Sequence, residues 1–225
     1  IRDSADAVEA LSKQYSGIRL ERQKKYLPFM VAEGCSFYDL YKQRFADNIG
    51  QLINAAMRQI EADNNQQLAG VLSSVDYNSE NALGTREHKN AILRDLLEDF
   101  EPLNLRPSVI EIKEGQVPAD VIGDAYEYMI GQFASMAGKK AGSFYTPAAV
   151  SEIMARIVNV QPGERVYDPT CGSGSLLIKA AKKQNSKEVS IYGQEVNGSS
   201  VAMAKMNMYI HEIRDAKIGW GDTLA

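Results

Sequence analysis

The sequence predicts an α-helical N-terminal domain followed by an α/β domain built on a parallel sheet. Apolar residues in the first hundred positions recur at helical spacing, whereas short strand-like and helix-like segments alternate from residue 164 onward. Strands that alternate with helices form parallel sheets through crossover connections. We therefore expect two domains, a helical one over residues 1–119 and the α/β one over residues 120–225.

The composition is that of an ordinary globular protein. The 225 residues are 44% hydrophobic and 24% charged, enough to bury a core in one or two domains, which excludes disordered and fibrous classes. The sequence shows neither the basic-then-apolar pattern expected of a leader nor an apolar run near the roughly 20 residues that span a bilayer, so we expect a cytoplasmic protein without a membrane partner. Two cysteines and two histidines predict no disulfide framework and no metal site.

Helices are expected first at two apolar repeats in the N-terminal half. The members of these repeats are Ile49, Leu52, Ile53, Met57 and Ile60, and then Ile92, Leu93, Leu96 and Phe100. Residues 103–119 contain Pro107, Gly115 and Pro118 and are expected to form a connector.

Two further helices are expected before the first strand. Asp120 suits the N-cap of a helix with an apolar stripe, interpreted as core, of Ile122, Tyr126, Met129 and Phe133. Residues 138–143 break that helix. Thr146 then suits the N-cap, and Pro147 the first turn, of a helix that runs through residue 157.

The remaining segments alternate regularly. Strands are expected at residues 164–168, 189–195 and 217–220, and helices at residues 175–183 and 199–213. The first of these strands passes into its helix through a turn that contains Gly172 and Gly174. Without side chains there, the backbone can approach a ligand closely, and the N–H groups of the new helix face it. A tight turn that needs only the conformational freedom of glycine is the alternative interpretation.

The residues around this turn indicate which ligand it would suit. Leu177 stands where the dinucleotide pattern needs a third glycine, and Asp168 would face a pyrophosphate, so a nicotinamide cofactor is disfavoured. S-adenosylmethionine carries an ammonium and a sulfonium group, which a carboxylate attracts. The turn therefore favours S-adenosylmethionine as the cofactor.

Two more carboxylates follow at the ends of the next strands. Glu195 lies where it could accept hydrogen bonds from the ribose hydroxyls, and Asp222 where it could accept one from the adenine amino group. Each acid taken singly could be a helix cap or a solvated loop residue. Because three successive strands deliver acids to the edge where open sheets bind ligands, we interpret the group as a nucleoside site.

Three other residues with reactive side chains are assigned no catalytic role. Cys171 could be mistaken for a nucleophile, but a cytosine-C5 methylase would place its thiol in a separate Pro-Cys loop, so Cys171 is interpreted as a small neutral filler. His88 and His211 have no motif around them and are interpreted as surface or core histidines.

Four motifs in order resemble the modification (M) subunits of type I restriction-modification systems. They are Gly142-Ser143-Phe144-Tyr145-Thr146-Pro147, then Val166-Tyr167-Asp168-Pro169-Thr170-Cys171-Gly172-Ser173-Gly174-Ser175, Gly193-Gln194-Glu195, and Gly221-Asp222-Thr223-Leu224. A Tyr-Thr-Pro motif ahead of the glycine turn is similar to the gamma class of adenine-N6 DNA methyltransferases. Residues 48–50, 76–78, 123–130 and 204–208 extend the resemblance over most of the chain.

The resemblance implies a Rossmann-like, S-adenosylmethionine-dependent methyltransferase fold, cut off after its third strand. The implied cofactor-binding residues are Ser143, Phe144, Tyr145, Thr146, Pro147, Ala148, Asp168, Thr170, Gly172, Ser173, Gly174, Ser175, Glu195 and Asp222. Thr146 would touch the carboxylate end of the cofactor, Glu195 the ribose and Asp222 the adenine. The family's catalytic Asn/Asp-Pro-Pro-Phe/Tyr motif is absent from these 225 residues, so no catalytic residue is assigned and the chain alone is expected to be inactive.

The resemblance also implies partners. Such M subunits act on DNA in a complex of two M subunits with one DNA-reading specificity (S) subunit, to which a motor-nuclease (R) subunit can attach. The net charge of −4 fits this arrangement, because a protein that grips DNA alone needs clustered Lys and Arg. Two alternatives remain open, a methyltransferase acting on protein glutamine or RNA, and a non-catalytic scaffold that retains the cofactor.

Overall fold

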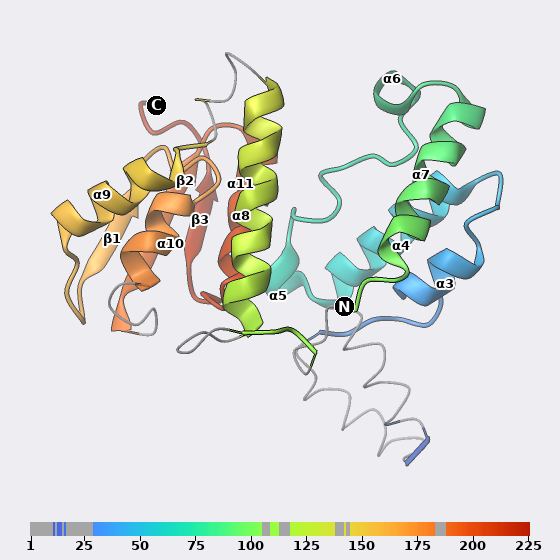
Figure 1. The fold of residues 1–225 in the computed structure, drawn as a ribbon, viewed down its shortest axis with the longest axis horizontal. Helices are drawn as coiled ribbons and strands as arrows, with labels where there is room; N and C mark the ends of the chain where they lie inside the picture. The colour runs from blue at the N-terminus through green and yellow to red at the C-terminus, as the bar shows by residue number, and fades with distance from the viewer. Residues whose placement is uncertain are drawn as a thin grey trace. The chain divides into compact units, whose positions relative to one another are not determined.

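The computed structural model of the protein divides into two compact units, Ile1–Arg106 and Pro107–Ala225 (Figure 1). The residues that it describes are 11, 13–14, 16, 29–104, 109–112, 118–137, 142, 145–182 and 188–225. In the first unit these residues form helices and turns, and in the second they form a parallel sheet with helices, as the sequence predicts. The boundary between residues 119 and 120 stays a prediction.

The first unit is a small helical bundle. Its described helices from residue 29 onward are α3 (Phe37–Lys42), α4 (Ile49–Asp63), α5 (Asn65–Leu68), α6 (Glu80–Leu83) and α7 (Arg86–Phe100). Both helices expected from apolar repeats are present, as α4 and α7. Their core comprises Leu40, Ile49, Ile53, Ala56, Leu93 and Leu97. Of the predicted repeat on α7, Ile92, Leu96 and Phe100 are exposed.

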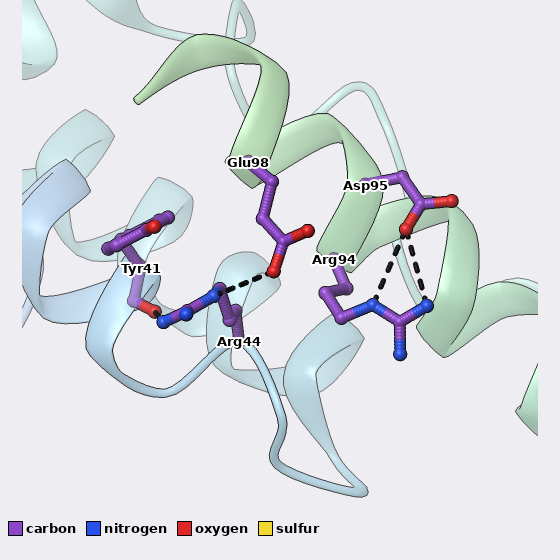
Figure 2. Close-up of polar contacts among 5 residues, drawn as sticks. All are labelled: Tyr41, Arg44, Arg94, Asp95 and Glu98. Carbon is purple, nitrogen blue, oxygen red and sulfur yellow. Dashed lines mark hydrogen bonds and ion pairs between the residues drawn. The ribbon is translucent and has the colours of Figure 1, made fainter. Parts of the chain in front are cut away.

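Arg44, just after α3, links that helix to α7. Its Nε donates to Oε1 of Glu98 at 3.0 Å, and Nη1 donates to the carbonyl of Tyr41 at 3.0 Å. Figure 2 shows this arrangement beside the pair formed by Arg94 and Asp95. The Arg44 guanidinium also lies 4.1 Å from the ring centroid of Tyr41. Because Arg94 and its neighbour are both well exposed, their pair adds little stability, whereas Arg44 joins two elements.

Two N-terminal segments that resemble the M subunits contact each other. A Cβ atom at Gly50, on α4, would collide with the backbone carbonyl of Tyr77. One turn further along α4, the Asn54 amide donates to Oδ1 of Asp76 at 2.6 Å and accepts from the backbone N–H of Tyr77 at 2.9 Å. Gly50 therefore permits a close approach that the Asn54 side chain then holds.

The second unit is built on a three-stranded parallel sheet with strand order β1-β2-β3. Its described elements are α8 (Pro118–Ala137), α9 (Ala148–Val158), β1 (Arg165–Asp168), α10 (Ser175–Lys182), β2 (Ser190–Glu195), α11 (Gly198–Ile210) and β3 (Lys217–Trp220). Asp168 is in register with Gly193, and Glu195 with Trp220. The alternation predicted from the sequence is confirmed, element by element.

The core of this unit lies between one face of the sheet and helices α10 and α11. One residue from each strand packs against side chains of the two helices. The strand residues are Val166, Ile191 and Ile218, and the helix residues are Leu177 and Ile178 of α10 and Ala204 and Met208 of α11. Helix α9 packs against α10, and α8 runs beside α11 (Figure 1). Helices α10 and α11 follow β1 and β2 directly, so their N-terminal ends and the turns before them lie at the carboxyl ends of the strands.

Three local predictions about α8 and α9 are wrong. Asp120 lies in the first turn of α8 and does not cap it, because the helix already begins at Pro118, whose missing N–H is tolerated there. Pro147, without a side-chain hydrogen bond, occupies the N-cap of α9 in place of Thr146. On α8, Met129 and Phe133 are 42% and 59% exposed, so they are not core residues.

The buried side of α8 consists instead of small residues and one isoleucine. Gly123, Ile130 and Ala134 are buried, at positions one residue along from the predicted stripe. A Cβ atom at Gly123 would collide with the ring of His211, which ends α11 and is only 7% exposed. His211 is thus a core histidine and His88 a surface histidine, the two interpretations that the sequence allowed for both residues.

The environment of His211 disfavours its charged form. Neither ring nitrogen has a hydrogen-bond partner among the described residues. The pKa of His211 is lowered to about 4, chiefly by burial and also by the charges of Lys182 and Lys179, while Asp120 acts in the opposite direction. The folded protein therefore holds a neutral imidazole at a pH where an unfolded chain, with a pKa near 6.5, already takes a proton.

We expect the free energy of unfolding to fall between pH 6.5 and pH 4. The unfolded state binds a proton in this window and the folded state does not, so stability is complete above pH 6.5 and declines through the window by roughly 3 kcal/mol. Urea unfolding at several pH values measures it. His211→Phe should flatten the profile and His88→Gln should leave it unchanged. An unaltered profile in His211→Phe would assign the pH dependence to other groups.

Candidate functional site

Three acids gather at the carboxyl edge of the sheet, as predicted. Asp168 ends β1, Glu195 ends β2, and Asp222 follows the end of β3 by two residues. Their environments differ, because Glu195 is only 6% exposed whereas Asp222 is exposed to solvent. Open parallel sheets bind ligands at this edge, so the three acids lie at the edge of the sheet where a ligand is expected.

The glycine turn between β1 and α10 adopts a backbone that needs glycine. Gly172 and Gly174 have φ angles of +53° and +78°, in the left-handed region. The N–H of Gly174 donates to the carbonyl of Cys171 at 2.7 Å, and the N–H of Cys171 donates to the carbonyl of Gln194 at 2.9 Å. Helix α10 then begins at Ser175, so its unpaired N–H groups lie at the turn.

Two buried side chains hold this turn in place. One carboxylate oxygen of Glu195 accepts from the N–H of Gly172 at 3.0 Å, and the other accepts from the N–H of Asn197 at 2.8 Å. The Asn207 amide, from α11, donates to the carbonyl of Ser173 at 3.0 Å. Each carboxylate oxygen offers two lone pairs, so Glu195 can anchor the turn and still accept from a ligand.

Two adjoining cavities open beside the turn. The smaller, of about 50 Å³, is lined by Tyr145, Thr146, Asp168, Thr170, Gly172, Ser173 and Ser175 together with Gly142, Cys171 and Leu176. The larger, of about 300 Å³, is lined by Asp124, Glu127, Tyr128, Tyr145, Thr146, Ala148, Ser175 and Lys179. They share Tyr145, Thr146 and Ser175, so together they form one surface of the size typical of small-molecule sites.

Both halves of the chain match family models. Residues 2–100 match the HsdM N-terminal domain, and residues 117–225 match the N-6 DNA Methylase domain. The chain is similar over 98% of its length to the crystal structure of the methyltransferase subunit of a type I restriction-modification system from Streptococcus thermophilus, with a TM-score of 0.71 and 27% identity. This chain belongs to the type I restriction enzyme methylase subunits.

Two curated relatives agree with this assignment. The methylase subunit of the type I enzyme MjaVIII from Methanocaldococcus jannaschii is 29% identical over 96% of this chain and 36% of its own length. That of MpnII from Mycoplasma pneumoniae is 39% identical over 61% of this chain and 26% of its own length. The chain also covers 47% of the Streptococcus thermophilus subunit. It therefore spans less than half of each methylase subunit compared.

Within this methylase-subunit fold, some predicted site residues do not line the cavities. Pro147 is exposed at the start of α9, and Gly174 is buried inside the turn. Glu195 is buried against the turn, where it accepts from the N–H of Gly172, and Oδ1 of Asp222 accepts from the N–H of Leu224 at 2.9 Å. Ser143 and Phe144, which precede Tyr145 in the same motif, lie outside the described residues. The predicted ligand contacts of all these residues stay predictions.

The cavities also contain residues that the sequence did not single out. Glu127 of α8 and Lys179 of α10 form an ion pair at 3.3 Å and line the larger cavity. Asn207, which fixes the glycine turn, was likewise assigned no role. The segments that contain Glu127 and Asn207 resemble the methylase subunits, which is the signal that could have directed attention to them.

Cys171 is not placed for nucleophilic chemistry in this methylase subunit. It is 6% exposed, and burial raises the pKa of its thiol to about 12, with further contributions from Asp168 and Glu195. Because the thiolate is the reactive form, Cys171 stays a neutral thiol at physiological pH. This agrees with its interpretation as a filler.

Among the helices that the structure describes, none has the length and apolar character to cross a membrane.

Proposed function

We propose that this chain supplies the S-adenosylmethionine site of an adenine-N6 DNA methyltransferase of the gamma class, acting as the M subunit of a type I restriction-modification complex. The observation that carries the proposal is the glycine turn, which Glu195 anchors at the carboxyl edge of the sheet beside a cavity that contains Asp168. Membership of the methylase-subunit family supports it.

The residues present suit this cofactor. Its ammonium and sulfonium groups are positive, and Asp168 and Glu127 line the adjoining cavities. In this proposal Thr146 binds the carboxylate end, the backbone of the turn faces the methionine part, Glu195 accepts from the ribose hydroxyls and Asp222 from the adenine amino group. When bound, the cofactor supplies an activated methyl group on its sulfonium sulfur. The protein's task is to orient that group and exclude water.

The target base would be bound outside these 225 residues. They contain no Asn/Asp-Pro-Pro-Phe/Tyr sequence, and the methylase subunits compared are more than twice as long. An adenine inside a duplex must be flipped out at a cost of a few kcal/mol and then held by hydrogen bonds and stacking. Asp168, Glu195 and Asp222 are assigned to the cofactor, so the chain alone is expected to transfer no methyl group.

The net negative charge of the chain indicates that a partner protein contributes to DNA binding. With 25 Lys and Arg against 29 Asp and Glu, the chain has no excess of cationic side chains to displace phosphate counterions. We therefore propose that a specificity subunit supplies most of the DNA grip and all of the sequence reading, in a complex with a second M subunit to which an R subunit can attach. A cytoplasmic location follows from this role.

The test combines binding and transfer. The natural full-length protein should bind S-adenosylmethionine with micromolar affinity, roughly −8 kcal/mol by calorimetry. With its specificity subunit it should transfer tritium-labelled methyl to DNA, and nuclease digestion should recover the label as N6-methyladenine. The 225-residue chain serves as the control and should bind cofactor without transfer. Label in protein or RNA, or on another base, would contradict the proposal, as would binding of no cofactor at all.

A further inference from the structure

One carboxylate that lines the larger cavity has an oxygen atom without a hydrogen-bond partner among the described residues. Glu127 uses Oε2 for its pair with Nζ of Lys179, and its side chain is only 13% exposed. Its Oε1 is buried and has no hydrogen-bond partner among the described residues. Because an unsatisfied buried carboxylate oxygen is costly, such an oxygen beside a cavity indicates a place for a donor from a ligand.

Glu127 lies on the same surface as the glycine turn. Tyr145, Thr146 and Ser175 line both its cavity and the smaller one at the turn. One helical turn beyond Glu127, Gly131 lets the Tyr145 hydroxyl approach α8 closely, since an added Cβ would lie 3.2 Å from that oxygen. A ligand held at the turn can therefore extend one end toward Glu127.

The charged residues that line this cavity favour a positively charged ligand group. Asp124 and Glu127 face one lysine, Lys179, so the charged groups known to line it are negative on balance. Lys179 already donates to Oε2 of Glu127, which leaves Oε1 as the carboxylate oxygen without a partner among the described residues. The cationic donor that matches it is a primary ammonium group.

We infer that Oε1 of Glu127 accepts a hydrogen bond from the α-ammonium group at the methionyl end of S-adenosylmethionine. Glu127 is then a cofactor-binding residue, and Lys179 positions it. This inference rests on the proposed function, since it assigns one end of the same ligand. The alternative is an ion pair that only ties α8 to α10, as Asp120 and Lys182 do at 3.0 Å outside both cavities.

Two ligands that differ only in the amine test this. They are S-adenosylhomocysteine and its deamino analogue, 5′-(3-carboxypropylthio)-5′-deoxyadenosine, titrated by calorimetry into the natural full-length protein and its variants. Wild type should prefer S-adenosylhomocysteine by roughly tenfold to a hundredfold, the range of a charge-assisted hydrogen bond. Glu127→Gln should lose most of this preference by weakening only the amine-bearing ligand. Asp120→Asn, which removes the other ion pair between the same helices, should keep it.

The outcomes separate the two proposals. If Glu127→Gln weakens both ligands equally, or neither, Glu127 is structural and the inference is wrong, while binding by wild type still supports the proposed function. If wild type binds neither ligand, both proposals fail. Should Glu127→Gln not fold, wild type alone decides, because equal affinity for the two ligands would show that nothing in the site recognises the ammonium group.

Discussion

Glu195→Ala is expected to lower the affinity for S-adenosylmethionine by about a hundredfold, or roughly 2.7 kcal/mol. The substitution removes the proposed acceptor for the ribose hydroxyls, and a hydrogen bond to a charged group contributes roughly 1.5–3 kcal/mol. It also removes the carboxylate that accepts from the N–H groups of Gly172 and Asn197. The glycine turn then loses its anchor, so the ligand meets a less ordered site. Calorimetric titration measures the affinity.

Two comparisons separate the contact from the anchor. Glu195→Gln keeps one acceptor oxygen without the charge and should bind with intermediate affinity. Asp222→Ala removes an exposed carboxylate, which solvent screens, and should weaken binding by less than about tenfold. Urea unfolding of each variant shows how much of the effect is lost stability. If Glu195→Ala binds the cofactor as wild type does, the ribose assignment is wrong.

Gly123→Ala is expected to destabilise the second unit by about 3 kcal/mol or more, or to prevent it from folding. In an exposed helix the same change would stabilise by up to about 1 kcal/mol, because alanine is the better helix former. At this position the added Cβ would collide with the buried ring of His211, so α8 and α11 must separate or distort. The sign of the change therefore tests the contact, and urea unfolding measures it.

The double substitution supplies the control. Gly123→Ala with His211→Ala removes the ring that the new methyl group would meet, so it should recover part of the stability lost in Gly123→Ala alone. Residues in contact show such non-additive effects, whereas distant ones do not. Simple addition of the two single losses would show that Gly123 and His211 do not meet as the structure has them.

The sequence by itself determined the order of the elements and the edge of the sheet at which the candidate site lies. Strand and helix periods are local properties, so the alternation from residue 164 onward could be predicted without knowing any tertiary contact. The parallel topology then follows from the alternation, and it brings the ends of β1 and β2, with Asp168 and Glu195, to one edge. The glycine turn was predictable for the same reason, since its backbone conformation depends on adjacent residues.

Only the tertiary structure decided which side of each helix is buried and which polar groups meet. Apolar spacing predicted a core stripe that includes Met129 and Phe133, yet the buried side of α8 consists of Gly123, Ile130 and Ala134. Large apolar side chains can remain exposed, and small residues permit the closest approach, so hydrophobicity alone does not select the buried face. The pair of Glu127 and Lys179 joins residues 52 positions apart. Such contacts depend on how helices dock against one another, which no local pattern encodes.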